Sequence, residues 1–379
     1  MKIVIIGGGV AGMTFASFSQ KKGMEVVICE RQAEKSSKGH AFLMHSRAIS
    51  ILQDLNPHGK ATMPGEKIGL FRLRRPGGME VKKEPLDSWL CIKRNDLLDF
   101  LESLLPEGTI KRGRCFSHFI REQDRVVAAA FLNGEVEYGD IFIGADGGHS
   151  KVRTEIFGKV TATPVAVKEI VGITNDRELA RKYGNTFVKF QHNKYGLSFG
   201  MIPTGQDEFV WFMQYDPSRG DIKSDDPGAI AAFCSQQLRD FPIEVGQLLR
   251  SNDFSKSYIW NTTDFDLLPS FHRENIVLLG DAAHLMLPFT SAGTTNAIIG
   301  AQALSGCLEK SATFEAAFRE YYRLRAQTVV EHILLGRQLK KAFLNPKEQE
   351  QKEMPLPFLS SARPAPGKRV GSDLLTVKY

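Results

Sequence analysis

The residues with the clearest chemistry lie at the start of the chain. A short apolar run, 2–6, is followed by Gly7-Gly8-Gly9-Val10-Ala11-Gly12, a helix-like segment, a second apolar run at 26–28 and the acid Glu30. This order of strand, glycine turn, helix, strand and acid suits a dinucleotide whose pyrophosphate rests on a helix N-terminus.

Each of three glycines in this turn has a physical reason. We expect Gly7 to allow the tight turn, Gly9 to let the backbone approach the phosphates, and Gly12 to let the helix pack closely on the strand. Glu30 is placed to accept hydrogen bonds from a ribose hydroxyl. This pattern alone leaves both NAD and FAD open as the nucleotide.

Two later segments combine glycine and aspartate directly after predicted strands. The first is Gly144-Ala145-Asp146-Gly147-Gly148-His149-Ser150, and the second is Gly280-Asp281-Ala282-Ala283-His284 followed by Pro288. Each places an aspartate at the carboxyl end of a strand, where a doubly wound sheet binds its cofactor. Ser150 is suited to cap the helix that follows.

In their order and spacing, the three segments resemble those of the single-component FAD-dependent aromatic hydroxylases, the para-hydroxybenzoate hydroxylase-like group A flavoprotein monooxygenases. The resemblance implies an α/β fold with a Rossmann-like FAD-binding domain (GR2-type). It also implies an inserted, mostly antiparallel β-sheet substrate domain and a C-terminal helix.

The resemblance also implies roles for individual residues. Asp281 would bind the ribityl hydroxyls of FAD, Arg94 would reach its phosphates, and Asp146 would have a structural or pyrophosphate-side role. The loop and helix N-terminus after Pro288 would face the flavin. The predicted FAD-binding residues are Gly7, Gly9, Val10, Ala11, Gly12, Glu30, Arg31, Arg94, Asp146, Asp281, Pro288, Gly293, Thr294 and Thr295.

The loop after Pro288 departs from the family pattern P-x-x-G-x-G-x-N. Ser291 replaces a glycine, Thr295 occupies the usual position of the asparagine, and Asn296 comes one residue late. A frequent aspartate further along this helix is Gly300 here. We expect a changed geometry on the substrate side or a changed redox tuning of the flavin.

In that family a flavin C4a-hydroperoxide transfers the oxygen, so the protein needs neither a metal nor a strong nucleophile. We therefore nominate no catalytic residue and no metal ligand, and we expect His45, His192 and His284 to be structural, surface or hydrogen-bonded histidines. Substrate contacts are expected from alternating strand positions and from the loop after Pro288. The candidates are Phe199, Met201, Phe212, Gln214 and Phe289.

The predicted function is an FAD-dependent monooxygenase that uses NADPH or NADH and O2 to hydroxylate an aromatic or polyketide-like small molecule. A reductase or dehydrogenase of the same fold is the first alternative, and a non-catalytic flavin-binding module is the second. A flavin halogenase is disfavoured because no paired tryptophans precede Ile202-Pro203.

Composition limits the other possibilities. The chain has 379 residues, enough for two domains, and a formal net charge of +6 that is spread along it. This pattern argues against nucleic-acid binding and suggests an anionic substrate. The five cysteines form no CxxC and no disulfide pattern. We expect no signal peptide, no transmembrane segment, a cytoplasmic location, and a monomer or homodimer.

The elements that must position these residues follow from apolar periodicity. We predict helices at 46–55, capped by Ser46, from Asn95 or Asp96 to Pro106, at 227–238 and 243–249, and at 314–343 with a break or bend. Strands are predicted at 68–73, 79–81, 126–132, 138–143, 186–190, 196–203, 208–215 and 276–279. The FAD-binding domain is predicted at 1–70, 92–164 and 264–345, the substrate domain at 71–91 and 165–263, and an extended tail at 346–379.

Overall fold

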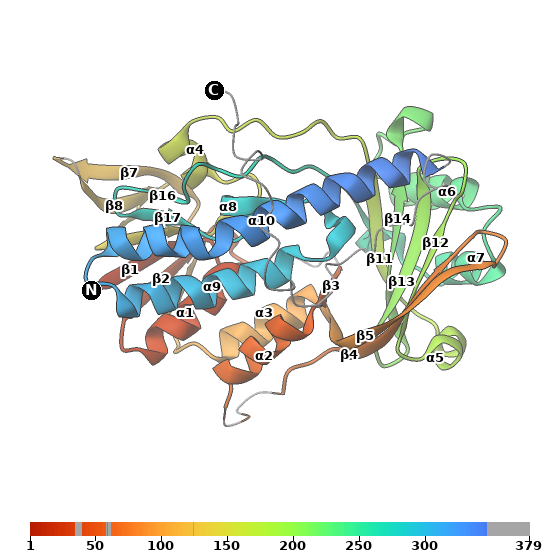
Figure 1. The fold of residues 1–379 in the computed structure, drawn as a ribbon, viewed down its shortest axis with the longest axis horizontal. Helices are drawn as coiled ribbons and strands as arrows, with labels where there is room; N and C mark the ends of the chain where they lie inside the picture. Colours follow the sequence, from red (N-terminus) through yellow and green to blue (C-terminus); the bar gives the residue numbers. More distant parts are fainter. Residues whose placement is uncertain (35–39, 58, 60–61, 124, 347–379) are drawn as a thin grey trace, which may run out of the picture.

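The strands form three sheets within residues 1–34, 40–57, 59, 62–123 and 125–346, the part of the chain that the computed structural model describes. The tail predicted from residue 346 lies outside this part except for its first residue. The fold is of the α/β class expected from the sequence, with a nucleotide-binding sheet at one end and a large, mostly antiparallel sheet at the other (Figure 1).

The first sheet has six strands in the order β16-β17-β10-β1-β2-β6. Its central strands are parallel, and only β16 runs antiparallel to its neighbour. The strands are β1 (Lys2–Ile6), β2 (Glu25–Glu30), β6 (Ile110–Arg112), β10 (Ile141–Gly144), β16 (His272–Arg273) and β17 (Ile276–Leu278).

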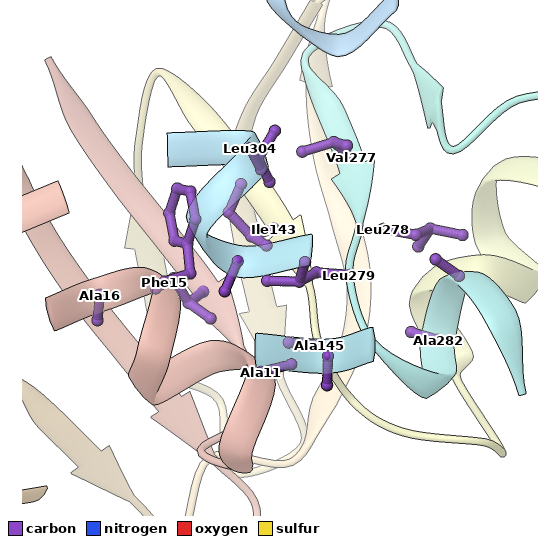
Figure 2. Close-up of a cluster of buried hydrophobic side chains, with 14 of the residues drawn as sticks. Ala11, Phe15, Ala16, Ile143, Ala145, Val277, Leu278, Leu279, Ala282 and Leu304 are labelled. Carbon is purple, nitrogen blue, oxygen red and sulfur yellow. The ribbon is translucent and has the colours of Figure 1, made fainter. Parts of the chain in front are cut away.

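Helices pack against this sheet through an apolar core. Helix α1 (Val10–Lys21) lies against α9 (Gly293–Lys310), and both contribute to the core cluster. Figure 2 shows Phe15 of α1 and Leu304 of α9 beside Ile143 and Leu279, and all four side chains are fully buried. This packing fixes the N-termini of α1 and α9 relative to the carboxyl ends of the strands.

The second sheet has eight strands in the order β15-β11-β14-β13-β12-β4-β5-β3 and is antiparallel except between β12 and β4. Helices α5 (Arg177–Tyr183), α6 (Pro227–Gln237) and α7 (Ile243–Arg250) contribute to a core cluster on one side of it. The strands are β3 (Ala41–Met44), β4 (Glu66–Arg74), β5 (Glu80–Lys93), β11 (Lys168–Asn175), β12 (Thr186–Gln191), β13 (Leu197–Gly205), β14 (Glu208–Tyr215) and β15 (Tyr258–Asn261).

The remaining elements complete the two halves. Strands β7 (Phe116–Glu122), β8 (Arg125–Phe131) and β9 (Val136–Tyr138) form the small third sheet. The other helices are α2 (Ser46–Leu55), α3 (Arg94–Ser103), α4 (Lys151–Phe157) and α8 (Asp281–His284). Helix α10 (Phe314–Leu344) is a single element that runs from the nucleotide-binding half toward the large sheet (Figure 1).

Several predicted boundaries are corrected. The strand predicted at 79–81 extends to Lys93, and β3 and the first residues of β4 join the large sheet although the predicted FAD-binding domain included them. Exposed, charged residues in β5 hid its strand character. The segment 138–143 forms two strands, and α10 has no break. His45, not Ser46, is the N-cap of α2, and its side chain makes no capping hydrogen bond.

None of the helices in the described residues is both long and apolar enough to cross a membrane. The five cysteines are free thiols, and four of them are buried.

Candidate active site

The glycine turn between β1 and α1 is shaped by close backbone contacts. Gly7 has φ +113°, and a Cβ added there would lie 2.3 Å from the Ala145 carbonyl oxygen. A Cβ on Gly12 would lie 2.2 Å from the Gly7 carbonyl oxygen. Gly9 differs, because its Cβ position has no atom within 4 Å. The backbone is therefore packed tightly on the inner side of the turn and open on the side of Gly9.

The open side of the turn leads to a cleft with a strongly polar end. Glu30 accepts hydrogen bonds from the backbone N–H groups of Gly8 (Oε2, 2.7 Å) and Gln32 (Oε1, 2.9 Å). Arg31 and Arg94, both predicted from the sequence, line this cleft. Sequence reasoning missed four further side chains that line it, Arg112, Arg114, His149 and Lys151. The arginine and lysine charges suit phosphate groups.

Asp146 and Ser150 organise the middle motif. The Asp146 carboxylate accepts hydrogen bonds from the backbone N–H groups of Lys151 (2.7 Å) and Val152 (3.1 Å). Ser150 Oγ accepts one from Arg153 N–H at 2.8 Å, which confirms its predicted capping of α4. The geometry gives Asp146 a structural contribution at a helix N-terminus.

A buried arginine at the end of the middle motif, to which the sequence assigned no role, joins the middle and late motifs. The Arg153 guanidinium donates to the carbonyl oxygens of Gly148 (2.6 Å) and Ala282 (3.0 Å), and it lies 4.5 Å from the Phe265 ring centroid. Burial lowers the pKa of Arg153, while Asp146 and Asp281 oppose that shift. Arg153 thus fixes the two aspartate-bearing segments relative to each other.

Asp281 begins α8 and lies at the edge of a second cavity. Desolvation by the surrounding walls raises the pKa of its carboxyl group to about 6, and the nearby Arg153 charge opposes the rise. This cavity has a volume of about 370 Å³. It shares Gly9, Arg94, Ala145 and Gly147 with the polar cleft, so the two form one continuous depression.

The N-terminus of α9 opens into the same cavity. Its N-cap is Ala292, which has no side-chain acceptor, and the Cβ position of Gly293 has no atom within 4 Å. Three residues of this region that were predicted to bind FAD line the cavity: Pro288, Gly293 and Thr294. Ser291, which replaces a family glycine, has φ +50°.

Two residues in the first turn of α9 do not line the cavity. Thr295 is buried, and its Oγ1 accepts a hydrogen bond from the His45 N–H at 3.2 Å. Asn296 is buried as well and donates to the Ala292 carbonyl oxygen at 2.9 Å. Thr295 does not line the cavity, because the helical rotation places this position on the inner side of α9, and its flavin contact stays a prediction.

One face of the large sheet forms the opposite wall of the cavity. Phe212 and Gln214 of β14 line it, as predicted. Phe199 and Met201 of β13 do not, because both belong to the core on the other face of the sheet. Their neighbour Gly200 faces the cavity side, where a Cβ would lie 2.1 Å from the Phe212 ring, so the ring lies directly over Gly200.

Phe289 is also placed away from the cavity. It packs against Phe343 near the end of α10, with ring centroids 5.6 Å apart. The single-turn helix 288–290 directs this side chain into an apolar cluster instead of toward the flavin side.

The sequence missed other cavity-lining residues that share the face of Gln214. Strand alternation in β11 and β15 could have grouped them, but their partner strands lie far away in the sequence. They are Glu169, Val171, Ile202, Val210, Tyr258 and Trp260, together with His40–Leu43 of the β3 region and Leu285–Leu287 before α9.

The three histidines behave as structural side chains. His45 stacks on Trp89 with ring centroids 4.0 Å apart, and burial lowers its pKa to about 4. Burial also lowers the pKa of His284 to about 3. His192 accepts a hydrogen bond from the Lys194 N–H at 3.1 Å.

The depression fits FAD on physical grounds. The N-termini of α1 and α9 present backbone N–H groups without side-chain caps, and Gly9 and Gly293 leave open space above them. Such N-termini stabilise negative charge. One lies beside the basic cleft and the other beside the large cavity, which matches the two ends of a long anionic cofactor.

Comparisons with known proteins agree with this geometry. The FAD binding domain family matches residues 1–323. The chain is 24% identical to aurachin C monooxygenase/isomerase of Stigmatella aurantiaca, with 86% of this chain and 85% of the relative covered. It is 25% identical to 3-amino-4-hydroxybenzoate 2-monooxygenase of Streptomyces cremeus, with 92% and 89% covered.

Among solved structures, Klebsiella pneumoniae HpxO complexed with FAD and uric acid has the same fold. The TM-score is 0.83 at 20% sequence identity, with 93% of this chain and 90% of that chain covered. The fold and the FAD cleft define a flavoprotein monooxygenase of the para-hydroxybenzoate hydroxylase-like group. This chain belongs to the FAD binding domain family, and FAD is its cofactor.

Proposed function

We propose that this flavin-dependent monooxygenase uses NADPH or NADH and O2 to hydroxylate a small aromatic molecule. The observation that carries the proposal is the continuous depression that runs from the Gly9 turn to the N-terminus of α9 and ends at the large sheet. Bound there, FAD would supply hydride acceptance and oxygen activation.

The residues of the chain have distinct parts in this proposal. The N-terminus of α1 binds the pyrophosphate, Glu30 accepts from the adenosine ribose, and Asp281 binds the ribityl hydroxyls. The N–H groups at the start of α9 stabilise negative charge on the reduced flavin. Phe212, with the other apolar side chains of the sheet wall, excludes water from the reacting ring.

The names of relatives support an aromatic substrate. One relative is a 3-amino-4-hydroxybenzoate 2-monooxygenase, and another, from Bordetella bronchiseptica, is a 6-hydroxynicotinate 3-monooxygenase. The mainly apolar sheet wall of the cavity is consistent with a flat ring held against Phe212.

The test uses the FAD-loaded protein, NADPH or NADH, and a panel of hydroxylated aromatic compounds under oxygen-18 gas. We expect at least one compound to accelerate NAD(P)H oxidation tenfold or more and to gain one labelled oxygen atom. Substrate-dependent flavin reduction without labelled product would favour the reductase alternative. A flavin that neither nucleotide reduces would favour the non-catalytic module.

A further inference from the structure

A buried polar chain crosses the cavity wall of the large sheet. Gln214 Nε2 donates to Glu169 Oε2 at 2.9 Å, and Gln214 Oε1 accepts from Lys189 Nζ at 2.9 Å and from Ser198 Oγ at 3.2 Å. Glu169 and Gln214 are directly paired on neighbouring strands and are 7% and 3% exposed. Burying an ionised acid in this apolar wall is costly unless its charge is paired or hydrogen-bonded, and Gln214 supplies one hydrogen bond.

The hydrogen bonds fix the orientation of the Gln214 amide. The Lys189 ammonium group can only donate, so Gln214 must present its oxygen to Lys189 and its NH2 group to Glu169. Glu169 Oε2 can accept this bond whether the carboxyl group is ionised or carries a proton on Oε1. The chain therefore remains intact through a protonation cycle of Glu169.

The second carboxylate oxygen, Oε1, has no donor among the described residues, and Glu169 lines the cavity together with Asp281, Gly293 and Thr294. In the part of the chain that the structure describes, the other charged or titratable groups of this wall and cavity are four that line the cavity and one that contacts Gln214. The lining groups are Tyr258 on β15, His40 before β3, Arg94 on α3 and Asp281 on α8, and the group at Gln214 is Lys189 on β12. Of the two carboxyl groups within the described residues that line the cavity, Glu169 lies on the sheet wall and Asp281 on the opposite side.

We propose that Glu169 is the base of this site and that its Oε1 accepts the proton of an aromatic hydroxyl or ring N–H group. The proposal rests on the proposed function and names the substrate class: aromatic rings that carry such a donor. The negative charge of Glu169 disfavours a substrate that places a carboxylate group next to it. An anionic substrate, which the net charge suggests, must therefore carry its charge away from Glu169.

The step balances without another reactant. The O–H or N–H bond of the substrate breaks, the proton goes to Glu169 Oε1, and the electron pair remains on the ring heteroatom. Delocalisation of that pair raises the electron density of the ring, which favours attack by an electrophilic oxygen. Lys189 is a positioning residue, because it acts on Glu169 through the Gln214 amide.

The electrostatics agree with this geometry. Burial raises the pKa of Glu169 to about 7, while Gln214 and the Lys189 charge oppose the rise. Burial lowers the pKa of Lys189 to about 8, and Glu169 opposes that shift. A base is most effective when its pKa lies near the working pH.

The test measures ligand binding to the FAD-loaded protein through changes in flavin absorbance, without NAD(P)H. The probes are phenol, 2-naphthol and 3-hydroxypyridine, each paired with its methyl ether. We expect the hydroxyl compounds to bind about tenfold more tightly at pH 8 than at pH 6, because Glu169 ionises between them. The ethers should show no such pH dependence.

Three variants sharpen the result. Glu169→Gln should abolish the pH dependence for hydroxyl compounds, while Lys189→Met should move its midpoint to higher pH because the opposing charge is lost. Glu107→Gln, an exposed matched change outside the cavity, should leave it unaltered. Flavin absorbance and circular dichroism confirm that each variant is folded.

Two outcomes would overturn the proposal: ethers that bind as tightly as their hydroxyl partners, or an unchanged pH profile in Glu169→Gln. These outcomes are separable from a failure of the proposed function. Labelled oxygen in the product together with an unchanged pH profile in Glu169→Gln would reject only the proposal that Glu169 is the base. A pH profile of binding that depends on Glu169, without labelled product, would reject only the proposed oxygenation.

Discussion

At the scale of single residues, the cavity wall contains a buried acid that destabilises the folded protein when it is ionised. Glu169 is an acid in an apolar wall, and its pKa of about 7 lies above the ordinary 4.5. The folded protein therefore binds the Glu169 proton more tightly than the unfolded chain does. Stability contributed by this group falls as the pH rises from about 4.5 to 7, and the loss is complete above 7.

We predict that Glu169→Gln stabilises the protein at alkaline pH. The amide keeps an acceptor for Gln214 and removes the buried charge, so the free energy of unfolding should rise by on the order of 1–3 kcal/mol at pH 8. At pH 5 the wild-type carboxyl group is already protonated, and the difference should nearly vanish. Urea unfolding of both proteins at the two pH values checks this, and an equal difference at pH 5 and pH 8 would contradict it.

At the scale of elements, helix N-termini divide into two kinds. Helices α4, α5, α6 and α10 are capped by the side chains of Ser150, Asp176, Asp226 and Thr313. Helices α1, α2, α3, α7, α8 and α9 have no side-chain cap, and among them α1 and α9 start at Gly9 and Ala292, which carry no side-chain acceptor. An uncapped N-terminus leaves N–H groups for a ligand. Helices α1 and α9 also have open space at Gly9 and Gly293, so their N-termini are prepared for an anion.

We predict opposite consequences for alanine at Gly9 and at Gly12. Gly12→Ala places a Cβ 2.2 Å from the Gly7 carbonyl oxygen, so the free energy of unfolding of the apoprotein should fall by about 1–3 kcal/mol. Gly9→Ala meets no protein atom within 4 Å and should leave that free energy unchanged. Its methyl group enters the space of the pyrophosphate, so FAD affinity should fall at least tenfold.

Denaturation of the two apoproteins and a fluorescence titration with FAD separate these effects. Each variant is the control for the other, since both introduce the same methyl group into the same turn. Unaltered FAD affinity in Gly9→Ala would show that the pyrophosphate does not approach this position.

The sequence predicted the elements whose pattern is local. The turn at Gly7–Gly12 and the capping by Ser150 depend on neighbouring residues, and both are found as expected. The prediction that Phe199 and Met201 of β13 face the cavity was wrong, because nearly every residue of that strand is buried on one face or the other. Alternation places Phe199 and Met201 on one face of β13, but it does not tell whether that face meets the core or the cavity, since Ser198 on the other face is buried too. Glu169 was missed for a related reason, since Gln214 comes from a strand 45 residues away.

At the scale of the whole molecule, three histidines in apolar surroundings are neutral at pH 7: His40 at the cavity, His45 on Trp89 and His284 near Phe271. Burial lowers the pKa of His40 and His45 to about 4 and that of His284 to about 3. Both ring nitrogens of His284 lack a hydrogen-bond partner in the described part of the chain. Arg325 adds positive charge nearby and lowers the pKa of His284 further.

The buried Arg325 charge has an amide partner, and Gly300, where the family often has an aspartate, supplies no acid. Arg325 is buried and donates to Asn296 Oδ1, and within the described residues it forms no ion pair with a carboxylate. The Gly300 position lies beside Tyr321, whose hydroxyl group would be 3.2 Å from an added Cβ. The interior therefore keeps a positive charge without a neighbouring acid, which makes further protonation there unfavourable.

We predict that the protein loses stability as the pH falls from 7 to 5. The folded pKa values of His40, His45 and His284 lie below the ordinary 6.5, so the unfolded chain binds protons first and stability drops as the pH passes below 6.5. Glu169 is buried, has a raised pKa and opposes the trend with up to one proton. The raised pKa of Asp281 opposes it less, because water reaches this carboxyl group. The remaining difference of one to two protons amounts to about 2–4 kcal/mol over this range.

Thermal unfolding of the FAD-loaded protein between pH 5 and 7 measures this loss, which should appear as a fall of several degrees in Tm. His284→Leu removes one of the three protons without breaking a hydrogen bond of the ring, so its Tm should depend less on pH than that of the wild type. Glu169→Gln removes an opposing group and should make the dependence steeper. A Tm that is flat or rises toward pH 5 would mean that the interior accepts these protons, and the buried positive charge of Arg325 argues against that result.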